Sequence, residues 1–451
     1  MGKADFIDDS RKAVEAMRER MGMAERPVSV EDFYAFMPMH QYLYVPTRDL
    51  WPASSVDGRI AEWPADPATG KRIRPSQYLD AIRPVEQMTW CPGLPMIVDG
   101  KGVSNGGWSE HTGSRVFNLY RSPPTLIGDP SNVEPWRDHL RLIYPDAWEH
   151  IERWFAQRVQ RPGEKINHAL VLGGKQGIGK DTILEPVKQA VGHWNWSEVS
   201  PAVMLQSFNA WCRAVVVRIS EARDLGDVDR FKFYDHSKTY IAAPPDVLQV
   251  NEKHIRQYAV FNVCGVVITT NHRTDGIYLP ADDRRHFVAW SEASKEEFAE
   301  DYWTRLWDWY GRGGIGNVAA QLRTLDLSSF DPKAPPPKTT AFHAIVDAGR
   351  APEDSELADA IEHAGNPDAV TLETIIANAR ALHLDELAND LADRKARRSV
   401  PHKMERVGYV AVRNPDAQDG HWKVAGRRGV VYAKADLAYS RQVRAARELC
   451  R

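Results

Sequence analysis

Residues 173–182 read Gly-Gly-Lys-Gln-Gly-Ile-Gly-Lys-Asp-Thr and constrain the fold more than any other part of the chain. Gly174, Gly179 and Lys180 satisfy the spacing G-x-x-x-x-G-K of a phosphate-binding loop, and Gly177 adds a further glycine. Glycines let backbone N–H groups point inward around an anion, and the lysine adds positive charge near the β- and γ-phosphates. An apolar run of buried-strand type, residues 167–172, precedes the stretch, and residues 182–191 can open a helix. Strand, glycine-rich turn and helix is the context that distinguishes such a loop from a flexible glycine turn.

Length and composition indicate a soluble protein of two to four domains. The chain has 451 residues, of which 43% are hydrophobic and 26% charged, as is usual for globular proteins. There is no run of eighteen apolar residues, so we expect no membrane span. The first residues lack the apolar core of a signal peptide, and the four cysteines are scattered without a C-x-x-C pair. These features predict a reduced, cytoplasmic protein without a disulfide framework or zinc module.

The chain divides by pattern into four parts. Residues 1–130 are irregular, rich in proline and aromatics, and predict an α+β region of unknown role with short strands near 88–98 and 114–120. Residues 131–312 predict an α/β domain: a helix over 134–159, then alternating strands and helices typical of a parallel sheet flanked by helices. The aromatic stretch 302–310 predicts a helix packed in the core. A proline-rich linker with helices follows over 313–368, and a separate domain over 369–451.

Charge is distributed unevenly between these parts. Residues 371–451 hold 16 Lys/Arg against 10 Asp/Glu, a net charge of +6, which leaves −9 on the rest of a chain whose total is −3. A basic terminal module on an acidic body indicates a polyanion partner at that end.

Polar residues follow the predicted strands where a nucleotide hydrolase needs them. Glu221 ends the apolar run 214–219 and is a candidate general base for the attacking water. Asn271 ends the run 264–270, where an uncharged amide can bridge the γ-phosphate and the water. Arg284 and Arg285 precede a last strand and could reach a neighbouring subunit's nucleotide as arginine fingers. Taken singly, these residues could instead be a surface glutamate, a turn-forming asparagine and a local ion pair with neighbouring aspartates.

The ordered set of phosphate loop, strand–Glu, strand–Asn and Arg-Arg–strand resembles the superfamily 3 helicases of the AAA+ class. It is most similar to the helicase part of phage and poxvirus primase-helicases, including a phage group with Gly-Lys-Asp-Thr loops. The resemblance covers roughly residues 130–310. It implies a Walker B role for Glu221, a sensor 1 role for Asn271 and a finger role for Arg284 or Arg285. It also implies ATP and Mg²⁺ as cofactors, and oligomeric rings, commonly hexamers, that translocate on single-stranded or forked DNA.

Two residues depart from the helicase pattern. Asp181 stands after the loop lysine, where Ser or Thr usually binds Mg²⁺, and Ser220 stands before Glu221, where Asp is usual. We expect Asp181 to supply the oxygen ligand near Mg²⁺ that the strand no longer supplies, with Thr182 or Ser220 assisting. The same exchange leaves open a protein whose ATP hydrolysis is slow or lost.

Two further segments are candidates for contact with DNA. Residues 247–261 predict a hairpin with Lys253, His254 and Arg256 at or near its tip, similar to the channel hairpin of superfamily 3 proteins, and Lys238 also suits that motif. The alternative is an ordinary solvated hairpin.

In residues 369–451, two helices near 372–379 and 384–391 precede a basic segment over 394–406. Strands near 409–413, 421–424 and 430–433 follow it. This order resembles a winged-helix domain, a fold that binds DNA or protein, and its candidate DNA contacts are Arg397, Arg398 and Lys403.

The sequence thus favours an ATP-dependent DNA helicase or translocase of phage or plasmid replication, acting as a homo-oligomeric ring with a separate primase or polymerase. The alternative is a DNA-binding initiator or loader that nucleotide switches without efficient turnover. A P-loop kinase is a third interpretation, which Asn271, the arginine pair and the basic tail disfavour.

Overall fold

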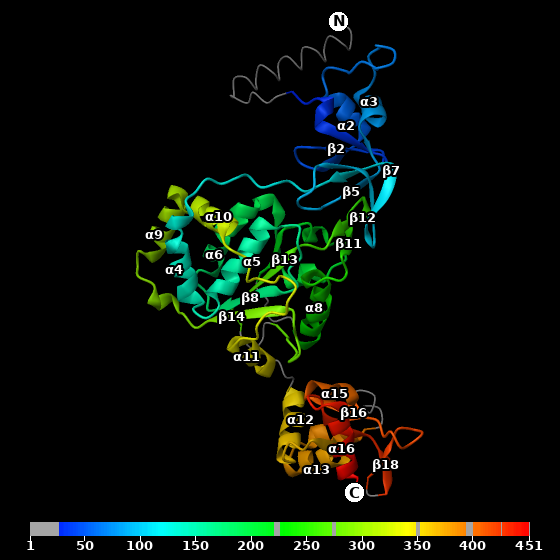
Figure 1. Cartoon of the computed structure of the whole chain (residues 1–451), viewed down its shortest axis with the longest axis vertical. Helices are drawn as coiled ribbons and strands as arrows, with labels where there is room; N and C mark the ends of the chain where they lie inside the picture. The colour runs from blue at the N-terminus through cyan, green and yellow to red at the C-terminus, as the bar shows by residue number, and fades with distance from the viewer. Residues whose placement is uncertain are drawn as a thin grey trace. The chain divides into compact units, whose positions relative to one another are not determined.

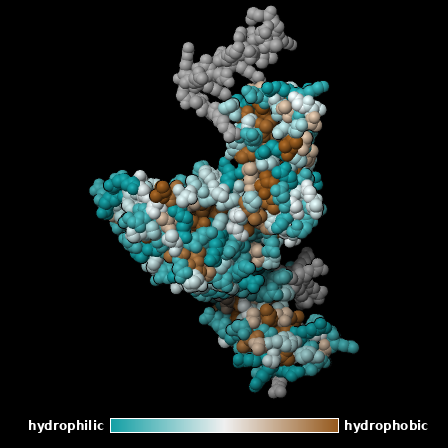
Figure 2. All heavy atoms as spheres, turned by 45° about the horizontal axis from the view of Figure 1, so that its top comes forward, coloured by the Kyte–Doolittle hydropathy of each residue, from teal (hydrophilic) through white to brown (hydrophobic). Residues whose placement is uncertain are grey.

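The structure is a computed structural model that describes residues 27–220, 226–272, 277–348, 352–393, 400–424 and 426–450, with the backbone alone for 226–231, 348, 352–353 and 427. They fall into two compact units, one within residues 1–222, 235–270 and 285–336, the other within residues 223–234, 271–284 and 337–451. Hydrophilic residues cover most of the face in Figure 2, with apolar patches between them. Among the described residues, no helix is both long and apolar enough to span a bilayer.

The larger unit begins with two small sheets. The first has the order β3-β2-β1-β4, from β1 (Phe33–Phe36), β2 (Gln41–Tyr44), β3 (Asp49–Trp51) and β4 (Pro84–Val85). Helices α2 (Ala53–Arg59) and α3 (Pro75–Ile82) pack on it around a core that includes Phe33, Tyr42 and Leu79. The second sheet has the order β5-β7-β6, from β5 (Gln87–Thr89), β6 (Ile97–Ser104) and β7 (Gly107–Asn118).

The single strand expected near 88–98 is therefore two strands. Pro92, Gly93 and Pro95 lie between them and break the ladder. The amide of Asn118 bonds the backbone of this loop at Cys91 and Leu94. The second expected strand, 114–120, lies largely within the longer β7.

A five-stranded parallel sheet forms the centre of the larger unit (Figure 1), as the alternating pattern predicts. Its order is β14-β8-β13-β10-β9, from β8 (Ala169–Gly174), β9 (Trp196–Val199), β10 (Val216–Ile219), β13 (Gly265–Thr270) and β14 (His286–Ser291). Every neighbouring pair is parallel, so all five carboxyl ends lie at one edge. All residues of β8 and β13 are buried, as expected for strands covered on both faces.

Helices α4 (Glu134–Ile143), α5 (Trp148–Gln160), α6 (Lys180–Val191), α9 (Tyr302–Trp309) and α10 (Ile315–Thr324) pack together beside this sheet. The expected helix over 134–159 is two helices, because Pro145 disfavours helical backbone at Tyr144 and ends α4 there. Gly265 lets α5 approach β13 closely, since a Cβ there would lie 2.6 Å from the Trp154 ring. The helix expected at the aromatic stretch 302–310 is confirmed as α9, but within α9 only Leu306 is buried and Trp307 is 49% exposed, so most of the helix is not packed in the core.

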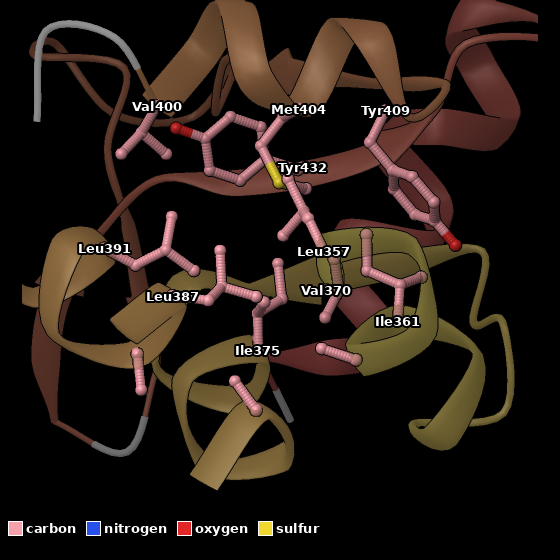
Figure 3. Packing of buried hydrophobic residues seen from close by; sticks show 13 residues of the cluster. Leu357, Ile361, Val370, Ile375, Leu387, Leu391, Val400, Met404, Tyr409 and Tyr432 are labelled. Atoms are coloured by element: carbon pink, nitrogen blue, oxygen red, sulfur yellow. The ribbon is translucent and has the colours of Figure 1, made fainter. Parts of the chain in front are cut away.

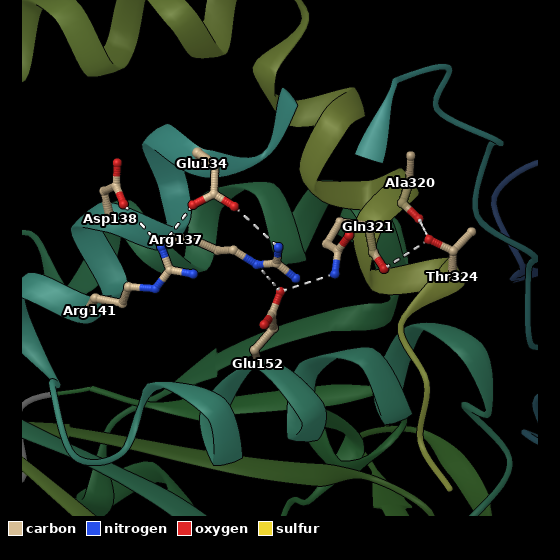
Figure 4. Close-up of polar contacts among 8 residues, drawn as sticks. All are labelled: Glu134, Arg137, Asp138, Arg141, Glu152, Ala320, Gln321 and Thr324. Atoms are coloured by element: carbon tan, nitrogen blue, oxygen red, sulfur yellow. Dashed lines mark hydrogen bonds and ion pairs between the residues drawn. The ribbon is translucent and has the colours of Figure 1, made fainter. Parts of the chain in front are cut away.

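A buried ion-pair network joins three of these helices (Figure 4). Glu152 of α5, 3% exposed, accepts from Arg137 of α4 at 2.8 Å and from Gln321 of α10 at 3.4 Å. Arg137 also reaches Glu134, one turn earlier on its own helix, at 3.4 Å.

Further elements of the larger unit include α7 (Pro201–Met204) and the antiparallel hairpin of β11 (Val247–Glu252) and β12 (Ile255–Phe261). Helix α8 (Gly226–Ile241) has its last residues, from Asp235 onward, in this unit.

In the smaller unit, the residues before β15 form helices, and the residues that follow form both strands and helices. Its helices are α11 (Thr340–Ala348), α12 (Pro352–His363), α13 (Leu372–Ala381), α14 (Asp385–Ala392), α15 (Val400–Arg406) and α16 (Tyr439–Leu449). Figure 3 shows apolar side chains from α12 to α15 meeting Val370, Tyr409 and Tyr432 of the strands in one core. Within this core, Leu357 and Ile361 of α12 belong to the same cluster as Ile375 of α13.

The three strands expected near 409–413, 421–424 and 430–433 do not form one sheet. β15 (Ala369–Thr371), β19 (Val431–Lys434) and β16 (Tyr409–Val412) form one antiparallel sheet in which β19 is central. β17 (Trp422–Val424) pairs only with β18 (Arg427–Gly429) among the described strands. The helices expected near 372–379 and 384–391 are confirmed as α13 and α14. Of the basic segment 394–406, residues 394–399 lie outside the described residues, and the remainder is α15.

Candidate nucleotide-binding site

The loop between β8 and α6 has the backbone of an anion cradle. Gly174, Gly177 and Gly179 have φ of +144°, +84° and +83°, values that residues other than glycine rarely adopt. Gly179 is the N-cap of α6, so the helix begins at Lys180 with its N-terminal N–H groups at the loop. Successive N–H groups in such a turn form a concave site for an anion, which the helix N-terminus reinforces.

Lys180 lies over this loop and is 8% exposed. Its Nζ donates to the carbonyl oxygens of Gly174 and Lys175, both at 2.7 Å. Burial lowers the pKa of Lys180 to about 8; the nearby Asp181 opposes this shift, and Arg218 adds to it. An anion in the loop would replace this internal contact and favour the charged amine.

An aromatic cluster behind the loop was not predicted from the sequence. His139 of α4 is fully buried; its Nε2 lies 3.2 Å from the carbonyl oxygen of Gly179 and its Nδ1 lies 2.9 Å from the hydroxyl of Tyr302. A Cβ on Gly179 would lie 2.5 Å from His139 and 2.6 Å from Trp303. The sequence holds one signal for this contact, since His139 lies on the same helical face as Trp136, Leu140 and Ile143.

Asp181, expected near Mg²⁺, is paired with an arginine that the sequence pattern did not single out. Its Oδ1 accepts from Nη2 of Arg218 on β10, which also reaches the Thr269 hydroxyl at 3.5 Å. Arg218 is 15% exposed, and Glu198 lies 3.9 Å from its Nη1. The Asp181 side chain is 70% exposed, so solvent also reaches the pair.

Each of the other two expected metal ligands lies close in the sequence to one member of this pair, Thr182 to Asp181 and Ser220 to Arg218. Thr182 is 8% exposed, and its carbonyl oxygen accepts from the Tyr310 hydroxyl at 2.9 Å. Ser220 follows β10, and its backbone N–H donates to Val199 at 3.0 Å. Among the described residues, no group of three or more His, Cys, Asp or Glu side chains is arranged to hold a metal ion.

Strands β10 and β13 end at the same sheet edge as the loop. Thr270 pairs with Gly173, so β13 ends directly beside the loop strand. Glu221 lies outside the described residues, one position after Ser220. Asn271, directly after β13, is exposed. Each therefore follows a strand that the structure places at this edge, whereas the Glu221 side chain itself is not described.

The two arginines before β14 differ in exposure. Arg284 is exposed and makes no ion pair with a described residue. Arg285 is half-buried, and its carbonyl oxygen accepts from the N–H of Ala169 at 2.8 Å.

The expected hairpin is confirmed. Lys253 and His254 form its turn and are exposed, with His254 at φ +65°, and Arg256 is exposed on β12. Lys238 is not part of this hairpin: it lies on α8 and contacts Asp235 of the same helix at 2.7 Å.

The N-terminal sheets contact this hairpin, which the sequence did not indicate. The Trp108 ring of β7 stacks on Phe261 of β12 at 5.3 Å between centroids. The Thr89 hydroxyl donates to the Ala259 carbonyl oxygen at 2.8 Å. Figure 1 shows β5 and β7 beside β11 and β12.

Of the expected DNA contacts in the smaller unit, Arg397 and Arg398 lie outside the described residues. Lys403 is 13% exposed, with its Nζ 2.6 Å from Asp390 of α14. In this structure its charge is therefore engaged within the unit.

The chain is a mixed α/β protein built on a parallel sheet. Proteins of similar sequence and similar structure are known. Residues 172–285 match the model of a family of unknown function (DUF5906). The DNA primase-polymerase of Nitratiruptor phage NrS-1 is 20% identical over 244 residues, 52% of this chain. The chain covers 30% of the length of that relative.

Solved structures of the C-terminal region of NrS-1 are similar along most of the chain. An apo structure has a TM-score of 0.61 at 14% identity and covers 89% of this chain and 95% of its own. A second apo form has a TM-score of 0.59 at 16% identity, covering 91% of this chain and 100% of its own. This protein therefore shares its fold with the C-terminal region of NrS-1.

Proposed function

We propose that this protein is an ATP-dependent DNA helicase or translocase of phage or plasmid replication, a superfamily 3 member of the AAA+ class that acts in the host cytoplasm. The observation that carries the proposal is the position of the glycine-rich loop. It follows β8, and the connections that leave β8 and its neighbour β13 run in opposite directions along the sheet, from β8 to β9 at one end and from β13 to β14 at the other. Ligands of open α/β sheets bind at this switch point, outside the carboxyl ends of the strands.

In this proposal the loop N–H groups and Lys180 hold the β- and γ-phosphates of ATP. Glu221 accepts a proton from the attacking water, Asn271 orients that water, and Arg284 or Arg285 reaches a neighbouring subunit's nucleotide. Arg284 is the better finger candidate, because its side chain is exposed and makes no ion pair with a described residue.

The oxygen donors near the loop suit Mg²⁺ in their chemistry. A carboxylate, Asp181, and two hydroxyls, Thr182 and Ser220, are hard ligands of the type that Mg²⁺ prefers. When bound, the ion would neutralise charge on the phosphates. Asp181 would first have to exchange its contact with Arg218 for the metal.

For the DNA, we propose a homo-oligomeric ring, a hexamer, in which Lys253, His254 and Arg256 of the hairpin contact the strand backbone. The smaller unit would be a winged-helix-like DNA-binding domain, with Arg397 and Arg398 as phosphate contacts. Lys403 would contribute only if its pair with Asp390 opened. The relative is named a primase-polymerase, and we propose that primer synthesis is the task of a separate primase or polymerase.

One observation favours a second function, a DNA-binding initiator or loader that nucleotide switches with little turnover. Arg218 neutralises the carboxylate expected to approach the metal, and Ser220 cannot replace that charge. A site of this kind can bind ATP while hydrolysing it slowly.

The ATPase rate with and without single-stranded DNA tests the proposal. Stimulation by DNA, abolished by Lys180→Ala, supports the translocase. Lys333→Ala is the matched control, because Lys333 is an exposed lysine of the larger unit that lies outside the loop, and it should leave at least half of the rate. Nucleotide-dependent assembly on DNA without turnover would instead support the loader, and phosphoryl transfer to a small acceptor would support a kinase.

A further inference from the structure

A half-open cavity of 220 Å³ lies between the N-terminal sheets and the β11–β12 hairpin. Its lining includes two aromatic rings, four side-chain amides and one charge of each sign. The rings are Phe36 and Tyr258, the charges are Arg256 and Glu86, and two of the amides are Asn105 and Gln257. We call it the hairpin pocket. All of its walls belong to the larger unit.

The pocket is too small for a whole nucleotide cofactor. Sites for drug-sized ligands enclose roughly 300–1,000 Å³, whereas this cavity has a volume of 220 Å³. It is also separate from the phosphate loop, since neither the loop nor Lys180 lines it.

The polar groups of the pocket suit the edge of a nucleobase. Asn105 Oδ1 accepts from Gln249 at 2.7 Å, and this leaves its amide N–H groups for a ligand. Gln257 is exposed and has no hydrogen bond from its amide to a described residue. Unstacked bases are bound in this way, with amides on their edges and aromatic rings against their faces.

The charges of the pocket favour a phosphate beside that base. Arg256 is exposed and makes no ion pair with a described residue, so its guanidinium is available to an anion. The acidic member of the lining, Glu86, accepts the Arg115 N–H at 2.6 Å. The Tyr258 hydroxyl is bonded to Glu252. Tyr258 is 7% and Phe36 4% exposed, so each can contact a base only through the small part of its ring that lines the pocket.

We propose that the hairpin pocket holds one unstacked base of a single DNA strand, with Arg256 on an adjacent phosphate. The N-terminal region is then part of the DNA-binding surface. This inference rests on one part of the proposed function, the contact between DNA and the β11–β12 hairpin.

Photo-crosslinking locates the base. A thymidine oligonucleotide carrying 5-iodouracil is irradiated with the full-length protein, and the modified peptides are identified by mass spectrometry. We expect adducts on Phe36 or Tyr258, the aromatic residues of the pocket. Adducts confined to the turn at Lys253 and His254, or to the smaller unit, would overturn the proposal.

Two substitutions test the chemistry by fluorescence anisotropy. Arg256→Ala should weaken binding of the oligonucleotide about tenfold and reduce the slope of log K against log salt by about 0.7, one phosphate contact on a single strand. Gln257→Glu should weaken binding and remove the pocket adduct, because a carboxylate repels the phosphate.

Matched controls lie on α2 and α3 of the same N-terminal region. Arg59→Ala and Gln77→Glu make the same chemical changes at exposed residues outside the pocket lining, and both should bind DNA as the parent does. Equal losses in controls and pocket variants would overturn the proposal.

The translocase and the hairpin pocket can be refuted independently of each other. DNA-stimulated ATPase without a pocket adduct would retain the translocase and refute the pocket. A pocket adduct that Gln257→Glu removes, in a protein without ATPase activity, would retain the pocket and refute the translocase.

Discussion

Two glycines of the phosphate loop share a backbone conformation but differ in their surroundings. Gly177 and Gly179 have φ of +84° and +83°. A Cβ on Gly177 would have Lys295 as its nearest neighbour, at 3.8 Å, whereas on Gly179 it would meet His139 and Trp303 at 2.5 and 2.6 Å. Position 177 therefore requires glycine only because of its backbone conformation. Position 179 requires it also because a Cβ would clash with the neighbouring rings.

Alanine at the two positions should separate these requirements. Gly177→Ala should lower the free energy of unfolding by about 1–2 kcal/mol, the cost of left-handed backbone for a residue with a Cβ. Gly179→Ala should lower it by about 3 kcal/mol or more, because the buried rings must also move. Urea unfolding of both variants measures the difference, and equal losses would contradict the close packing behind the loop.

Half-buried His150 and buried His168 form a pair whose Nε2 atoms lie 2.9 Å apart. Burial, with Arg153 nearby, lowers the pKa of His150 to about 4. Burial, with His150 and His286 nearby, lowers the pKa of His168 to about 3. Both rings are therefore neutral in the folded protein at pH 7, and one donates its proton to the other.

Acid should destabilise the protein through this pair. In the unfolded chain both imidazoles take up a proton near pH 6.5, whereas in the folded protein they stay neutral to a lower pH. The stability that the folded state gains from this difference is present above pH 6.5 and is lost as the pH falls toward 4. We expect a loss of about 1–2 kcal/mol per histidine between pH 7 and 5. Urea unfolding at both pH values measures the loss, and His168→Gln should reduce it. An unchanged pH dependence in that variant would refute the assignment.

At the scale of elements, α4, α5 and α10 depend on one buried carboxylate. Glu152 is 3% exposed and joins Arg137 to Gln321 (Figure 4). Glu134 also contacts Arg137, but its side chain is 51% exposed. Removing a buried partner leaves an uncompensated charge, whereas removing an exposed one does not.

Alanine substitutions should reflect that difference. Glu152→Ala should lower the free energy of unfolding by about 3 kcal/mol, and Glu134→Ala by about 0.5 kcal/mol or less. Thermal unfolding compares the two. If Glu134→Ala proved as damaging as Glu152→Ala, burial would not be the deciding factor.

At the scale of the whole molecule, the smaller unit has an apolar core of its own. Leu387, Leu391 and Met404 are at most 4% exposed and pack with Tyr432 of β19 (Figure 3). A core of this kind allows a unit to unfold independently of the nucleotide site.

Leu387→Ala should therefore destabilise the smaller unit alone, by about 2–5 kcal/mol. Hydrogen exchange should accelerate in peptides from 352–450, while the affinity for an ATP analogue is unchanged. Leu449→Ala is the control, since Leu449 is 36% exposed and should change stability by about 0.5 kcal/mol or less. Accelerated exchange in the larger unit would contradict independent unfolding.

Local patterns in the sequence sufficed to predict the strand, glycine-rich loop and helix around Lys180, the 247–261 hairpin and the aromatic helix at Tyr302. Each depends on residues within about a dozen positions, where backbone preference and apolar period act directly. The apolar spacing over residues 134–159 predicted a single helix, because it does not register the break at Pro145. The structure has two helices there.

The contacts that complete the candidate site required long-range packing. His139 contacts Gly179 across 40 positions, Arg218 contacts Asp181 across 37, and Thr89 contacts Ala259 across 170. No local preference specifies such pairs, because they form only when the sheet order and the packing of its helices bring distant segments together. The order of amino acids alone specified the glycine-rich loop and the strand and helix beside it. Folding in three dimensions selected the side chains that surround the loop and brought the N-terminal region against the hairpin.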